Sequence, residues 1–84
     1  MAQTIVEGTI RRGGAPVAGA YVQVLDPQGA FTGERRTGGD GAYRFYLVPG
    51  RWSLVAFAGG GARAERELTL DEGDAVRLDL DLGT

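Results

Sequence analysis

The sequence predicts an all-β protein, folded as a seven-stranded antiparallel β-sandwich. Apolar residues alternate with polar ones at a period of two, which is typical of strands, rather than at the helical period of 3.6. Gly, Pro and Asp residues interrupt the alternation after about every ten residues, the spacing expected for short sandwich strands. The length of 84 residues corresponds to a single domain covering residues 1–84.

The first four strands follow from this alternation. The first covers residues 4–12 and ends at the turn of residues 13–16, and the second ends at residues 26–27. The third, residues 31–37, is polar enough to lie at the edge of a sheet. The inward faces are marked by Val6, Gly8 and Ile10 in the first strand, Ala20, Val22 and Val24 in the second, and Tyr43, Phe45 and Leu47 in the fourth.

The last three strands complete the core. Trp52, Leu54 and Ala56 mark the fifth strand, and the sixth ends at Leu68 and Leu70. In the seventh, apolar residues at positions 76, 78, 80 and 82 alternate with charged ones, which predicts a half-buried strand. Residues 39–41 and 49–50 supply tight turns. The predicted core includes Val22, Tyr43, Phe45, Trp52, Leu54, Leu78 and Leu80.

The composition excludes several classes of function. The net charge of −2 argues against nucleic-acid binding. No apolar run approaches the roughly 20 residues that span a bilayer, and the start, Met1-Ala2-Gln3-Thr4, has no signal-peptide pattern. We therefore expect a cytoplasmic protein without membrane contact. Cys, His and Lys are absent, so there is neither a disulfide nor a thiolate metal site, and no cofactor is expected.

The same inventory predicts that the protein is not an enzyme and has no catalytic residues. Ser53 is the single serine, and no histidine is available to activate it. The carboxylates fall mainly in turns or at outward strand positions, typical of solvated charges. Two weaker alternatives remain open: residues 71–74 with Asp40 as oxygen ligands for Ca²⁺, and Arg35, Arg36 and Arg44 as an anion site rather than ion-pair partners of Glu34 or Glu65.

A set of large side chains breaks the inside–outside alternation. Tyr46 falls on the opposite face of its strand from the core residues, as do Val55 and Phe57, and Tyr21 in the second strand. Gathered in so small a domain, such residues form an apolar patch of interface size. Tyr21, Tyr46, Val55 and Phe57 are therefore the candidate interaction patch. A second inner layer formed by sheet curvature and plain scatter are the competing interpretations.

The segments "VEGTIRRGGAPVAGAYVQVLD" and "TGGDGAYRFYLVPGRWSLVAF" together resemble the carboxypeptidase regulatory-like domain. That family's pattern is V-x-G-x-V, a turn, G-x-P-V-x-G-A-x-V-x-L, then D-G-x-Y-x-F and P-G-x-Y-x-L. The matching positions are Val6, Gly8, Ile10, Pro16, Val17, Gly19, Ala20, Val22, Asp40, Gly41, Tyr43, Phe45, Pro49, Gly50, Trp52 and Leu54.

This resemblance implies a prealbumin-like (transthyretin-like) sandwich, and every matched residue is a core or turn residue. Within this group the chain is similar to short, stand-alone actinobacterial-type proteins of unknown function, often encoded beside a thiosulfate sulfurtransferase. That similarity implies an accessory role in sulfur metabolism, although this chain has no cysteine to carry sulfur.

The sequence thus favours a non-enzymatic binding or assembly module that mediates protein–protein interaction. The partner is a second copy, giving a homo-oligomer, or a larger enzyme encoded nearby. The alternative is a small-ligand or carbohydrate binder that uses exposed aromatic and Arg residues. A flat patch shared by Tyr46 and Phe57 would favour assembly, whereas Trp52 or Tyr21 in a concave site would favour ligand binding.

Overall fold

The computed structural model describes residues 3–83, which contain nine β-strands and one short 3-10 turn. Met1 and Ala2, at the start where we expect no signal peptide, and Thr84 lie outside the described residues. The elements are β1 (Ile5–Arg12), β2 (Ala15–Pro16), β3 (Tyr21–Leu25), β4 (Phe31–Arg36), β5 (Ala42–Tyr46), β6 (Gly50–Phe57), η1 (Gly59–Gly61), β7 (Arg63–Leu70), β8 (Ala75–Arg77) and β9 (Leu80–Asp81).

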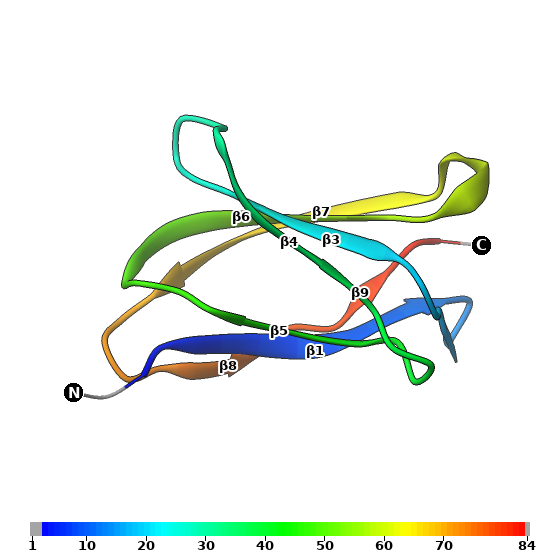
Figure 1. Cartoon of the computed structure of the whole chain (residues 1–84), viewed down its shortest axis with the longest axis horizontal. Coiled ribbons are helices and arrows are strands. Elements are labelled where there is room, and N and C mark those ends of the chain that lie inside the picture. Colours follow the sequence, from blue (N-terminus) through cyan, green and yellow to red (C-terminus); the bar gives the residue numbers. More distant parts are fainter. Residues whose placement is uncertain (1–2, 84) are drawn as a thin grey trace.

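The strands form two sheets that lie one above the other (Figure 1). The four-stranded sheet has the order β4-β3-β6-β7, and all its pairs are antiparallel. In the five-stranded sheet β1 is central: it pairs antiparallel with β5 and β2, and parallel with β8 and β9. The prediction of an all-β fold is therefore confirmed.

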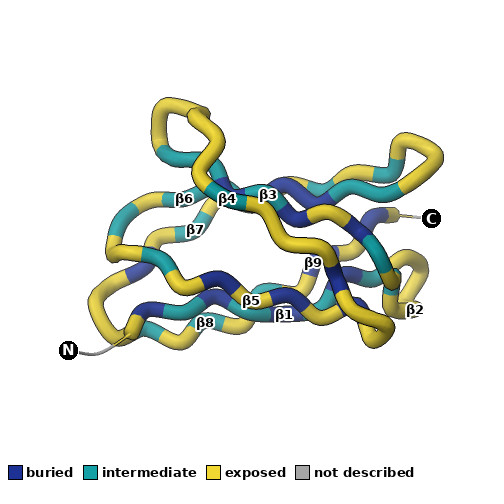
Figure 2. Tube along the Cα trace, in the orientation of Figure 1, coloured by how far each residue is buried: buried dark blue, intermediate teal, exposed yellow. Residues whose placement is uncertain are grey.

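The core lies between the sheets and draws on both. Buried residues alternate with half-buried ones along most of β1 and with exposed ones along β5 (Figure 2), as the period of two requires. Five of the seven predicted core residues are buried. They are Val22, Tyr43, Phe45, Leu54 and Leu80, and they join Val6, Ile10, Val24 and Ala56 in one cluster.

Trp52 and Leu78 are only half-buried at the margin of this cluster, which corrects their assignment to the core. Trp52 lies near the start of β6, where its ring N–H donates a hydrogen bond to the Val48 carbonyl at 2.9 Å. Leu78 lies between β8 and β9 rather than within a strand. Alternation marks the inward face, but it does not show how completely the opposite sheet covers each position.

Two details of the predicted strand pattern are wrong. The expected seventh strand is divided into β8 and β9, and residues 15–16 form the additional strand β2, so the described residues contain nine strands instead of seven. Both β8 and β9 run parallel to β1, so the five-stranded sheet is mixed rather than antiparallel. Alternation reports which face a side chain takes, but it carries no information on the neighbouring strand or its direction.

The change of sheet after β7 explains the parallel pairing. The turn of residues 71–74 leads the chain from β7 in one sheet to β8 in the other. There the Gly73 N–H donates to Thr4 Oγ1 at 3.1 Å, and the Ile5 N–H donates to the Asp74 carbonyl at 2.8 Å. These bonds fix the start of β8 beside the start of β1, so both strands run in the same direction.

The turn before β5 forms as expected and requires its glycine. Gly41 has φ of 76°, and a Cβ there would lie 2.6 Å from the Ile10 carbonyl oxygen. The Ala42 N–H donates to Asp40 Oδ1 at 3.0 Å, and the Ile10 N–H donates to the Gly41 carbonyl at 2.8 Å. The close approach places β5 directly against β1.

Helical structure is confined to η1 in the part of the chain that the structure describes. Its three residues are all glycine, and they join β6 to β7. No helix within residues 3–83 is long and apolar enough to cross a membrane.

Candidate functional site

The outer face of the four-stranded sheet gathers most of the candidate interaction patch. Val22, Val24, Leu54 and Ala56 point into the core, so the residues between them point outward. Residues that are directly opposite each other in antiparallel strands share a face of the sheet. The strand register therefore brings Tyr21 and Phe57 together as direct partners and places Val55 one step along the sheet.

The end of this face next to η1 forms an aromatic row, which we define as Arg36, Tyr21, Phe57 and Arg63, one residue from each strand in register. The rings of Tyr21 and Phe57 are stacked, with centroids 5.4 Å apart and planes inclined by 19°. Arg36 Cζ lies 5.2 Å from the centroid of the Tyr21 ring, within range of a cation–π interaction. The aromatic pair is thus bounded by an arginine on each edge strand.

The next set of outward residues forms an acidic row, which we define as Glu34, Gln23, Val55 and Glu65. Val55 is only 4% exposed, so its prediction as an exposed patch residue is wrong. It lies on a central strand between Gln23 and Glu65, and the aromatic pair follows in the next row. These larger neighbours shield its short side chain although it points away from the core.

Tyr46 does not belong to this face. It lies on β5 in the other sheet, opposite Ile5, and is 55% exposed. The expectation of a single patch shared by Tyr46 and Phe57 is therefore wrong, because two stacked sheets have two separate outer faces. Tyr46 and Leu47 instead border two hollows of about 350 and 270 Å³.

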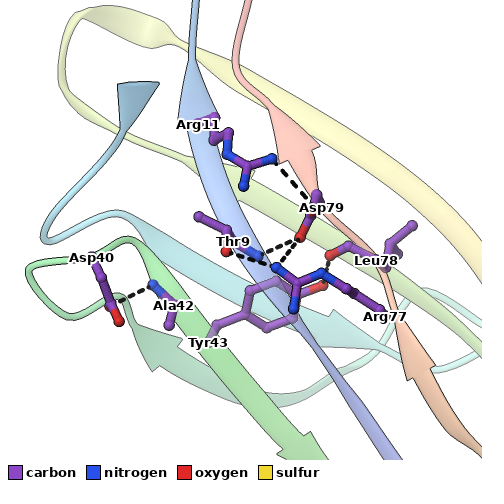
Figure 3. A network of polar contacts seen from close by, with 8 residues as sticks. All are labelled: Thr9, Arg11, Asp40, Ala42, Tyr43, Arg77, Leu78 and Asp79. Carbon is purple, nitrogen blue, oxygen red and sulfur yellow. Dashed lines mark hydrogen bonds and ion pairs between the residues drawn. The ribbon is translucent and has the colours of Figure 1, made fainter. Parts of the chain in front are cut away.

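The outer face of the five-stranded sheet carries a polar network (Figure 3) beside an open hollow of about 550 Å³. Asp79 Oδ1 accepts a hydrogen bond from the Thr9 N–H at 2.8 Å, and Arg77 and Arg11 each approach the Asp79 carboxylate to 3.4 Å. The Thr9 N–H, followed by these two guanidinium groups, lowers the pKa of Asp79 below its ordinary value. Charged groups here are paired with one another, including Arg44 with Glu7 at 2.7 Å.

Gly8 and Tyr43 explain why the Thr9 N–H donates its hydrogen bond to the Asp79 side chain rather than to the backbone. In a regular parallel ladder that N–H would bond to the Leu78 carbonyl, but the Leu78 carbonyl instead accepts a hydrogen bond from the Tyr43 hydroxyl. A Cβ on Gly8 would lie 2.0 Å from the Leu78 oxygen, so only glycine leaves room for it. Burial, together with the charge of Asp79, raises the pKa of Tyr43. Sequence reasoning missed this arrangement; the signal that could have revealed it is a glycine at an inward strand position, between Val6 and Ile10, because glycine within a strand often marks a close approach of another backbone segment.

The structure does not assemble the possible calcium site. Asp40 is next to Gly41, whose carbonyl accepts a hydrogen bond from the Ile10 N–H near the end of β1. The Asp74 carbonyl accepts a hydrogen bond from the Ile5 N–H at the start of β1. The two acidic segments therefore lie at opposite ends of this strand. Within residues 3–83, no group of three or more acidic side chains is placed to hold a metal ion.

The arginines considered as an anion site are also separated. Arg36 covers Tyr21 on one sheet, while Arg44 pairs with Glu7 on the other. The alternative partners Glu34 and Glu65 contact Gln23 at 3.1 Å and Arg63 at 3.5 Å. Ion pairing is thus the role of Arg44, although its partner differs from those expected.

Neither Tyr21 nor Trp52, the residues expected in a concave ligand site, borders any of the three hollows described above. Ser53 lies on the outer face of the four-stranded sheet, where its register partners are Leu25 and Glu67. The geometry therefore draws attention to a surface rather than to a pocket.

Comparison with known proteins gives the family of the chain. Residues 1–82 match the family described as "Protein of unknown function (DUF1416)". The chain belongs to this family. The DUF1416 match bears out the resemblance to small proteins of unknown function.

DUF1416 homologues of this chain occur in mycobacteria. Two uncharacterized proteins of Mycobacterium tuberculosis, Rv0814c and Rv3118, are each 37% identical over 60 residues, a match covering 70% of this chain and 60% of the relative. An uncharacterized protein of Mycolicibacterium smegmatis is 35% identical over 60 residues, covering 70% of this chain and 67% of the relative. The chain thus spans less than two thirds of the length of the M. tuberculosis relatives.

Proposed function

We propose that this protein is a non-enzymatic binding or assembly module that acts through protein–protein contact on the outer face of its four-stranded sheet. The observation that carries the proposal is the aromatic row. Its stacked Tyr21 and Phe57 lie between Arg36 and Arg63. Tyr and Arg are the residue types that most often dominate binding energy at protein interfaces, together with Trp.

The charges of this face favour a protein partner over a nucleic acid. The aromatic row is basic at both edges, and the adjacent acidic row carries Glu34 and Glu65. A surface of mixed sign matches another mixed surface, whereas a polyanion needs a continuous basic one. The cross-strand stack borders none of the three described hollows, so it suits a broad contact better than a small ligand, which is generally held in a concave site.

The residue inventory supports the non-enzymatic part of the proposal. The chain has no His, Cys or Lys, and Ser53 lies outside the three described hollows. Nucleophilic catalysis needs a nucleophile beside a base that activates it, and Ser53 has no histidine to serve as that base.

A more specific identity forms part of the same proposal. We assign the chain to the carboxypeptidase regulatory-like, prealbumin-like sandwiches, acting in the cytoplasm as an accessory to a larger enzyme, with sulfur metabolism as the candidate setting. Three residues of the family's sequence pattern support the domain assignment. Gly8 allows the close approach of the Leu78 backbone, and Gly41 forms the tight turn before β5. Tyr43 donates the hydrogen bond to the Leu78 carbonyl. The metabolic setting rests on the sequence resemblance alone.

Replacement of Phe57 by glutamate tests the proposed surface. Phe57 is half-buried and its partner Tyr21 is 37% exposed, so a charge there disrupts the row while the core between the sheets is retained. Tyr46→Glu is the matched control, because Tyr46 is an exposed aromatic residue on the other sheet. The wild type and both variants are immobilised, and the proteins that each retains from an extract of the native host are compared. The affinity of each for the purified partner is then measured.

We expect Phe57→Glu to weaken binding by about 30-fold or more, since loss of an interface hot spot costs at least about 2 kcal/mol. Tyr46→Glu should bind as the wild type does. Equal binding by Phe57→Glu and the wild type, or no association of the wild type with itself or with any host protein, would refute the proposal.

A further inference from the structure

The two rows on the outer face carry opposite charges in the same order along the sheet. Arg36 and Glu34 are neighbours on the outward side of β4, and Arg63 and Glu65 are neighbours on the outward side of β7. Between them, the aromatic pair lies next to Gln23 and Val55. Each basic edge position therefore has an acidic position two residues away on the same strand.

This pattern is self-complementary under one symmetry operation. A two-fold axis in the plane of the face, parallel to the rows and midway between them, exchanges the aromatic row with the acidic row. It keeps each position along the row unchanged. From this relation, and on the basis of the function proposed above, we infer that the binding partner is a second copy of this chain, stacked face to face.

The operation specifies the contacts of the dimer. Arg36 lies opposite Glu34 of the second copy, and Arg63 lies opposite Glu65 of the second copy. Phe57 lies over Val55 of the second copy. Because the interface is isologous, each of these contacts occurs twice.

The arrangement also fits the way that sheets pack. Two sheets in face-to-face contact stand about 10 Å apart with their strands within about 30° of each other, and this two-fold axis runs the strands of the two copies antiparallel. Beyond the aromatic row, Gly59–Gly61 between β6 and β7 add no side chains to the contact.

The exposure of the charged groups allows them to change partners. The side chains of Arg63 and Glu65 are 61% and 50% exposed, and the ion pair between them within one copy is 3.5 Å long. A surface pair of this kind contributes little stability. Association therefore replaces two weak pairs within the copies by two pairs between them, in a setting with less water.

Charge reversal distinguishes this arrangement from any other. Arg63→Glu and Glu65→Arg each place like charges opposite one another twice in the homodimer, so each variant alone should raise the dimer dissociation constant by about tenfold or more. An equimolar mixture of the two variants restores opposite charges at both contacts and should recover the dimer. The double variant Arg63→Glu/Glu65→Arg should dimerise by itself.

Sedimentation velocity and light scattering over a range of protein concentrations at low salt measure these states. The matched controls are Arg12→Glu and Glu72→Arg, two exposed charges away from this face, which should leave dimerisation unchanged alone and in mixture. Far-UV circular dichroism checks that each variant is folded. If the position 63 variants do not fold, the equivalent exchange of Arg36 and Glu34 provides the same test on β4.

Three results would overturn the inference: a wild type that stays monomeric at every concentration, reversal variants that dimerise like the wild type, or a mixture that remains monomeric. A monomeric wild type that binds another host protein, with binding lost in Phe57→Glu, would refute the second copy as partner and leave the proposed function standing. Failure of both experiments would refute the two together.

Discussion

Substitution of Gly8 by alanine should strongly destabilise the protein, although it adds a single methyl group. The new Cβ would lie 2.0 Å from the Leu78 carbonyl oxygen and 2.6 Å from its carbon, and both of these atoms belong to the backbone. They cannot rotate away as a side chain can. The backbone at Leu78 must shift, and the shift separates its carbonyl from the hydroxyl of Tyr43, a residue that is only 5% exposed.

Two costs add up in this variant. Overpacking of a filled site costs about 1–3 kcal/mol, and a buried hydroxyl left without its partner costs about another 1–3 kcal/mol. In a domain of this size each kcal/mol lowers Tm by roughly 4–8 °C, so we expect Gly8→Ala to melt at least about 8 °C below the wild type. Thermal unfolding followed by circular dichroism, with urea titration for the free energy of unfolding, measures the effect.

Matched glycines separate the steric effect from the effect of glycine itself. Gly39 and Gly59 have no atoms near the position of a Cβ, and neither has a positive φ, so alanine should be tolerated at both. Tyr43→Phe removes the hydroxyl alone, and its effect should not add fully to that of Gly8→Ala because both act on the Leu78 carbonyl. A Gly8→Ala variant that melts within about 2 °C of the Gly39→Ala and Gly59→Ala variants would refute the reasoning.

Two further predictions concern the core and the polar network. Phe45→Ala should destabilise the protein by about 3–5 kcal/mol, because Phe45 is only 5% exposed. The control Phe31→Ala, at a residue that is 60% exposed, should stay within about 0.5 kcal/mol of the wild type. Equal melting temperatures for the two variants would show that the inward face is wrongly assigned. Asp79 has a lowered pKa in the folded state, so its stabilising contribution is present above the ordinary value of about 3.9 and is lost as the pH falls through the folded-state pKa. Asp79→Asn should therefore lose less stability than the wild type between about pH 5 and pH 2, and Tm curves that fall in parallel over this range would contradict the assignment.

The candidate surface could be predicted in part from the sequence. Alternation placed Tyr21, Tyr46 and Phe57 outside the core, because the direction of a side chain in a strand depends on its parity alone. It could not reveal that Tyr46 lies on a different sheet from the other two, since each sheet has an outer face of its own. The burial of Val55 was also out of reach, because it depends on Gln23 and Glu65 in neighbouring strands that are distant in the chain.

The sequence by itself determined the class of this fold, most strand positions and the turn at Gly41, since these depend on residues that are close together in the chain. Only the tertiary structure decided that β8 and β9 run parallel to β1, because the alternation of apolar residues does not depend on the direction of the neighbouring strand. The same holds for the aromatic and acidic rows. Each combines single residues from four strands, and their order across the sheet is fixed by long-range pairing that a local pattern does not encode.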